Sequence, residues 1–113
     1  MALPRAKSAE VIDLWPLGEV RAPAPTRTLV KTDQLEVIRL AVPAGKEFPQ
    51  HQVSGEITVQ CLEGRVALTA HATAHELRAG QMLYLAGHEP HSLRGIDDAS
   101  VLLTILLHPQ HEK

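Results

Sequence analysis

The stretches GKEFPQHQVSGEITVQCLEG (residues 45–64) and GQMLYLAGHEPHSLRG (residues 80–95) decide the fold of this chain. Each begins and ends on a glycine and encloses a run of β-branched and aliphatic residues, EITVQCLE in the first and QMLYLA in the second. Such runs favour β-strands, and glycine readily adopts the backbone conformations that tight turns require. Both stretches therefore predict strands bounded by turns.

The same pattern extends along the chain on both sides. The runs TRTLV and QLEVIRLAV precede the first stretch, RVALTAH and HELRA lie between the two, and SVLLTILL follows the second. We place a hairpin tip at residues 72–74. Turn signals at intervals of about 8–12 residues are typical of a β-sandwich or barrel. The sequence predicts an all-β domain of two antiparallel sheets that close a barrel.

The N-terminal part differs from this domain. The segment SAEVIDLW (residues 8–15) predicts about two helical turns with Ser8 as N-cap, and RAPAPT after it is a stiff, extended connector. We therefore divide the chain into an N-terminal arm with a proline-rich connector (residues 1–26), a β-barrel domain (27–108) and a C-terminal tail (109–113). The arm is expected to pack on the domain or on a second subunit.

Composition restricts the class of protein. The chain has 113 residues, a formal charge of −2 and a pI near 6.4, which gives no electrostatic basis for binding nucleic acid. The single cysteine excludes an intramolecular disulfide, and the longest apolar run is far shorter than a membrane span. The N-terminus lacks the apolar block of a signal peptide. We expect a soluble, cytoplasmic domain with no membrane or nucleic-acid partner.

The two glycine-bounded stretches resemble the two motifs of the cupin family, GX5HXHX3–4EX6G and GX5PXGX2HX3N. His51 follows the first glycine at the family's spacing, Gly64 closes the first motif, and His91 has its expected place in the second. The resemblance covers roughly residues 35–107. It implies a cupin jelly roll, the RmlC-like double-stranded β-helix.

The resemblance also implies where a metal ion would bind. In a complete cupin, two histidines and a carboxylate of the first motif and the histidine of the second motif hold one divalent ion. Here His51 and His91 occupy two of these four positions, whereas Val53 and Ile57 occupy the other two. A single ion such as Zn, Fe, Mn or Ni would need a third ligand from elsewhere.

Two residues are candidates for that third ligand. Glu56 lies one residue before the family's carboxylate position, so its side chain would point the wrong way unless a bulge at Gly55 turns it inward. His88, three positions before His91, is the weaker candidate. The candidate metal set is thus His51 and His91 with Glu56 or His88.

The alternation of the strand after His51 points instead to an apolar pocket. Val53, Ile57, Val59 and Cys61 fall on the predicted inner face of the barrel, with Leu83 and Leu85 as further apolar neighbours. We expect His51 and His91 to form a polar spot in this dry pocket. Cys61 is interpreted as a small buried apolar residue.

Three functions follow from these residues. We favour binding of a small molecule in the barrel through the histidine pair. The alternative is a metal-dependent enzyme of the cupin type, a dioxygenase, isomerase or decarboxylase, and the third is a barrel that acts as a dimerising scaffold. The sequence identifies neither the ligand nor a catalytic residue.

The last strand bears on assembly. In residues 101–107 one face is formed by Val101, Leu103, Ile105 and Leu107, yet Leu102 and Leu106 flank Thr104 on the other. A strand of a two-layer sandwich normally has one polar face. The second apolar face is expected to be covered by the N-terminal arm or by a partner subunit, and we favour the partner subunit of a homodimer.

Overall fold

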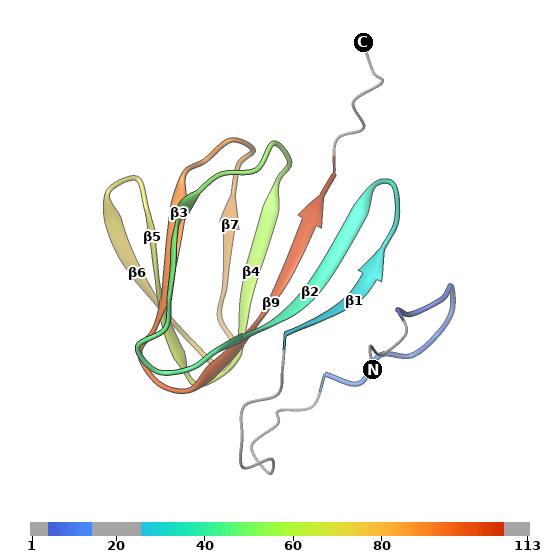
Figure 1. The fold of residues 1–113 in the computed structure, drawn as a ribbon, viewed down its shortest axis with the longest axis horizontal. Helices are drawn as coiled ribbons and strands as arrows, with labels where there is room; N and C mark the ends of the chain where they lie inside the picture. The colour runs from blue at the N-terminus through green and yellow to red at the C-terminus, as the bar shows by residue number, and fades with distance from the viewer. Residues whose placement is uncertain (1–4, 15–25, 108–113) are drawn as a thin grey trace.

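The protein, described by a computed structural model for residues 5–14 and 26–107, is built from β-strands (Figure 1). The strands are β1 (Arg27–Lys31), β2 (Leu35–Val42), β3 (Glu47–His51), β4 (Ile57–Glu63), β5 (Arg65–Ala70), β6 (Thr73–Arg78), β7 (Met82–Leu85), β8 (His91–Gly95) and β9 (Ala99–Leu106). The residues described contain no helix with the length and apolarity needed to cross a membrane.

The strands form two sheets that face each other. One sheet has the order β1-β2-β9-β4-β7 and the other β3-β8-β5-β6, and every pair of neighbours is antiparallel. Strands distant in sequence become neighbours, as β2 and β9 do (Figure 1). The expectation of an all-β domain with two antiparallel sheets is confirmed.

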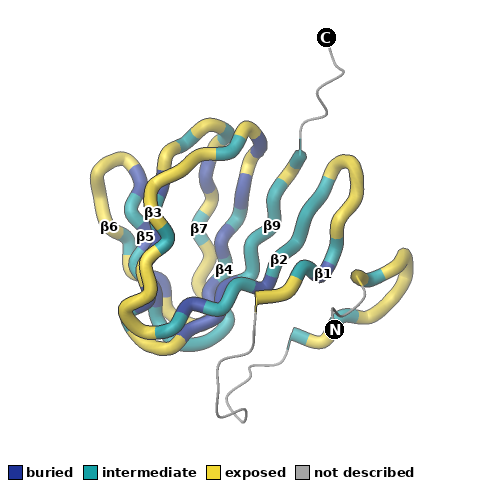
Figure 2. Tube along the Cα trace, viewed as in Figure 1, coloured by how far each residue is buried: buried dark blue, intermediate teal, exposed yellow. Residues whose placement is uncertain are grey.

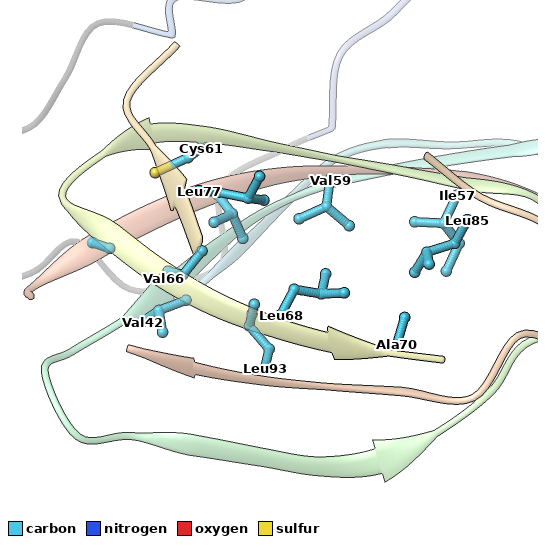
Figure 3. Packing of buried hydrophobic residues seen from close by; sticks show 12 residues of the cluster. Val42, Ile57, Val59, Cys61, Val66, Leu68, Ala70, Leu77, Leu85 and Leu93 are labelled. Atoms are coloured by element: carbon cyan, nitrogen blue, oxygen red, sulfur yellow. The ribbon is translucent and has the colours of Figure 1, made fainter. Parts of the chain in front are cut away.

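Alternation along the strands produces the core. In β4 and β5 every second residue is buried (Figure 2), because successive side chains of a strand point to opposite faces and only one face of each sheet meets the other sheet. The core cluster, most of it labelled in Figure 3, comprises Val42, Ile57, Val59, Cys61, Val66, Leu68, Ala70, Leu77, Leu85, Leu93, Ala99 and Val101.

The two glycines that bound the first motif are required for different reasons. Gly64 has a φ of +75°, and a Cβ there would lie 2.2 Å from the backbone oxygen of Asp98. Gly45 also has a positive φ, +82°, yet a Cβ there would meet nothing within 4 Å. Gly64 is therefore required by close backbone approach as well as by conformation, whereas Gly45 is required by conformation alone.

The prediction of a helix at residues 8–15 is wrong for residues 8–14, which are not helical. Trp15 lies outside the described residues. Ala9 has a φ of +69°, which a right-handed helix excludes. The backbone N–H of Glu10 donates to the Lys7 carbonyl at 3.0 Å and closes a single turn, and the Lys7 N–H donates to Oε1 of Glu10 at 2.8 Å. The arm contacts the domain through the Ala6 N–H, which donates to the Leu29 carbonyl at 2.8 Å.

The hairpin between β5 and β6 turns slightly earlier than expected. Its tip is His71 and Ala72, with φ values of +56° and +61°, and β6 already begins at Thr73. Two central residues with positive φ are the geometry of a two-residue hairpin turn that matches strand twist. The tip placed at residues 72–74 is thus wrong by about one residue, since no glycine or asparagine marks this turn.

The outer face of the five-stranded sheet has an apolar part. The register aligns Met82 with Gln60 and Leu102, and Tyr84 with Thr58 and Thr104, so these side chains share the face opposite the core. Met82, Tyr84 and Leu106 are 61%, 58% and 44% exposed. We call Met82, Tyr84, Leu102 and Leu106 the outer apolar face.

Alanine at Gly64 should destabilise the fold much more than alanine at Gly45. Gly64→Ala adds a backbone collision to the conformational strain and should lower the free energy of unfolding by about 3 kcal/mol. Gly45→Ala adds only the strain and should cost about 1 kcal/mol. Urea unfolding followed by circular dichroism measures both, and equal losses would contradict the close approach at Gly64.

The homodimer remains a prediction, which we now assign to the outer apolar face. Light scattering should give twice the monomer mass at tens of micromolar, where an interface burying about 800 Å² per partner holds. Met82→Lys should shift the protein to monomer, because an unpaired charge at the centre of an interface is costly to desolvate. Ala74→Lys, an exposed change on the other sheet, is the matched control. A monomeric wild-type protein would contradict the prediction.

Candidate functional site

A cavity of about 210 Å³ lies between the two sheets. Strands of both sheets contribute to its wall, and one residue comes from the loop between β3 and β4. The lining residues are Leu40, Phe48, His51, Val53, Ile57, Val59, Leu68, His91, Leu93, Leu103 and Ile105. All but the two histidines are apolar, so the imidazoles are the polar side chains of this wall.

The pairing of β3 with β8 brings His51 and His91 together. Phe48 lies opposite Leu93, and His51 lies opposite His91. Between these two pairs β3 has one residue more than β8. A bulge of one residue reverses the direction in which later side chains point. Without it, Gln50 would oppose His91 and the imidazole of His51 would turn away from the cavity.

The two imidazoles are in contact. Their ring centroids are 4.5 Å apart and the ring planes are inclined by 57°. His91 is 7% exposed, whereas His51 lies at the exposed end of β3. The prediction that the two histidines lie within a few ångströms of each other agrees with this geometry.

Each imidazole is oriented by a backbone carbonyl two residues earlier in the chain. Nδ1 of His51 lies 3.1 Å from the Pro49 oxygen, and Nδ1 of His91 lies 2.9 Å from the Glu89 oxygen. A carbonyl oxygen only accepts hydrogen bonds, so Nδ1 carries the proton in both rings. In the neutral imidazole the lone pair is then on Nε2, the nitrogen that can bind a ligand or a metal.

The apolar residues proposed from sequence divide into two groups. Val53, Ile57 and Val59 line the cavity. Cys61 does not, and in Figure 3 it lies at the end of the core cluster away from Ile57 and Leu85. Leu85 belongs to the core cluster and Leu83 packs against it, and neither lines the cavity. The placement of Cys61 in the pocket is therefore wrong.

Cys61 has the surroundings of a structural residue. Its side chain is fully buried, and Sγ lies 3.4 Å from the carbonyl oxygens of Glu63 and Gly64. Burial raises the pKa of the thiol above its ordinary value, which keeps it protonated near neutral pH. This agrees with its interpretation as a small buried apolar residue.

Neither candidate for a third metal ligand reaches the cavity. Glu56 is exposed, and its carboxylate acts on Tyr84, whose pKa is raised by desolvation of the hydroxyl and then by this negative charge. Glu56 directly precedes β4, its carbonyl accepts a hydrogen bond from the Leu106 N–H at 2.9 Å, and its side chain is not among those that line the cavity.

His88 is likewise directed elsewhere. It has a φ of +65° in an exposed loop, and its backbone N–H donates to the Val53 carbonyl at 2.7 Å. The loop thereby contacts the cavity wall through its backbone, while the imidazole is not among the lining side chains. The roles of Glu56 and His88 as third ligands are corrected accordingly.

The donor set falls short of a catalytic metal centre. Such zinc sites use three protein ligands, and non-haem iron oxygenases use two histidines and a carboxylate on one face. Within residues 5–14 and 26–107 no group of three histidine, cysteine or acidic side chains has the geometry to hold an ion. His51 and His91 fit two coordination positions.

Six lining residues were not identified from the sequence. They are Leu40, Phe48, Leu68, Leu93, Leu103 and Ile105. Alternation places most of them on inner faces, but it does not tell which part of an inner face stays open and which is filled. Phe48 had a usable signal, because it lies in the first motif three residues before His51.

The chain is similar to known proteins in structure and not in sequence. No family model and no curated protein matches the chain. A conserved protein of unknown function from Streptococcus pyogenes has a similar structure, with 22% identity, a TM-score of 0.76 and coverage of 96% of each chain.

Two structures described as cupins are also similar. A cupin superfamily protein from Desulfitobacterium hafniense has 16% identity and a TM-score of 0.77, covering 93% of this chain and 100% of its own. An RmlC-like cupin with a double-stranded β-helix fold from Methanocaldococcus jannaschii has 16% identity and a TM-score of 0.71, covering 89% and 95%. Identities this low speak for the fold. The chain has the fold of a small single-domain cupin, the RmlC-like double-stranded β-helix.

Proposed function

We propose that this protein binds a small organic molecule in the cavity between its sheets and holds it through His51 and His91. The observation that carries the proposal is the pair of imidazoles, 4.5 Å apart, in a wall that is otherwise apolar. Ligand sites characteristically combine apolar walls with a few convergent polar groups. The residue types, their positions and the volume of the cavity all support this function.

The volume limits the size of the molecule. An apolar cavity of about 150 Å³ is enough for benzene, so about 210 Å³ admits a single ring with a small substituent. Burial of the ring against the apolar side chains would supply most of the affinity, at roughly 25 cal/mol per Å². The imidazoles would fix the orientation of the polar substituent.

A cupin-type metal enzyme is the second candidate function. Its support is the orientation of both rings, because Nδ1 bound to a carbonyl leaves Nε2 as the coordinating nitrogen. Metal analysis of protein purified without a histidine tag tests it. A stoichiometric ion that is lost from the double variant His51→Ala, His91→Ala would establish a metal site at the histidine pair, which this enzyme requires, whereas metal-free protein would count against the enzyme.

The double variant His51→Ala, His91→Ala should bind phenol at least tenfold more weakly than the wild-type protein. The removed imidazoles are the polar partners in the wall, and one lost hydrogen bond of about 1.4 kcal/mol is a factor of ten. Titration followed by amide chemical shifts measures the affinity and maps the site, with changes expected at Val53, Ile57 and Leu103.

The matched control is the double variant His75→Ala, His88→Ala, which removes two imidazoles that do not line the cavity. It should bind phenol like the wild-type protein, and circular dichroism should show both variants folded. Unchanged phenol binding in the His51→Ala, His91→Ala variant would show that the site has been assigned wrongly.

A further inference from the structure

We infer that the ligand of this cavity presents a hydrogen-bond donor to the histidine pair, as a ring hydroxyl of a phenol or cyclic enol does, and that carboxylates are disfavoured. The inference rests on the proposed function and specifies the chemical class of the ligand. Its evidence is the hydrogen bonds between the two Nδ1 atoms and backbone carbonyls, together with the composition of the cavity wall.

The backbone contacts of the two imidazoles determine which nitrogen carries the proton. Both Nδ1 atoms face backbone carbonyl oxygens, at 3.1 Å for His51 and 2.9 Å for His91. These contacts are hydrogen bonds only if Nδ1–H is the donor, so both neutral rings are the same tautomer. Each Nε2 then offers a lone pair, and the site presents two acceptors.

Two acceptors in an otherwise apolar wall disfavour a carboxylate ligand. A carboxylate also carries only lone pairs, so it binds such a pair only after an imidazole takes up a proton. The other lining side chains are apolar and donate no hydrogen bond that would compensate the charge. Moving an uncompensated carboxylate from water into an apolar site is strongly unfavourable.

The same two acceptors favour a ligand that carries a hydroxyl group. A hydroxyl donates its proton to one Nε2, and its apolar ring can fill the remaining volume. His91 is 7% exposed, so a ligand that covers its Nε2 displaces the remaining water, and a ligand without a donor then leaves this acceptor unpaired. Such a loss is what makes sites built for a hydroxyl discriminate against analogues that lack it.

The experiment compares pairs of probes with nearly the same shape. Phenol and toluene differ by a hydroxyl in place of a methyl, and benzoate and cumene differ by a carboxylate in place of an isopropyl group. Affinities are measured by amide chemical-shift titration at one pH near 8, with EDTA present so that no metal ion bridges a probe to the imidazoles.

We expect phenol to bind at least tenfold more tightly than toluene, and cumene to bind more tightly than benzoate. In the double variant His51→Leu, His91→Leu the preference for phenol over toluene should disappear while toluene still binds. This readout differs from a general loss of structure, because the apolar probe reports that the cavity has been kept.

Three results would overturn the inference. Equal affinity for phenol and toluene, or tighter binding of benzoate than of cumene, would show that the histidines do not act as acceptors, while binding in the cavity itself would stand. Failure of all four probes, toluene and cumene included, would instead overturn the proposed binding function, and this inference with it.

Discussion

The antiparallel ladder between β3 and β8 is the constraint on which the site depends. At one end it is closed by the motif glycines, because the Gly45 N–H donates to the Gly95 carbonyl at 2.9 Å and a Cβ on Gly95 would lie 2.3 Å from the Pro43 oxygen. At the other end stand His51 and His91. With one end fixed, a single extra residue in β3 decides which side chain faces the cavity.

The same ladder explains how two polar rings are accommodated beside an apolar cavity. Each imidazole bonds to a carbonyl of its own strand or of the loop just before it, so one nitrogen of each ring is satisfied before any ligand arrives. The second nitrogen of each ring makes no such backbone contact and is left for water or a ligand. Both rings belong to residues that line a cavity, so a ligand in this cavity can reach them.

Several misplaced residues share a physical cause. The family's spacing places Glu56 near the carboxylate position, but its side chain is exposed and its charge acts on Tyr84 of β7, a residue distant in sequence. Cys61 has the right parity for the inner face, yet parity does not distinguish the filled end of the barrel from the open one. The arm has an amphipathic pattern, and Ala9 nevertheless adopts a positive φ that ends any helix.

The sequence by itself determined the all-β class, the two antiparallel sheets and the meeting of His51 with His91. Strand periodicity, turn residues and motif spacing act locally, and the pairing of two motif strands follows from the family pattern that the glycines reveal. The bulge in β3, the open part of the inner face and the protonated nitrogen of each ring were decided only by the tertiary structure. Each of these depends on where a backbone carbonyl or an opposing sheet lies in space, and no local pattern in the chain encodes that distance.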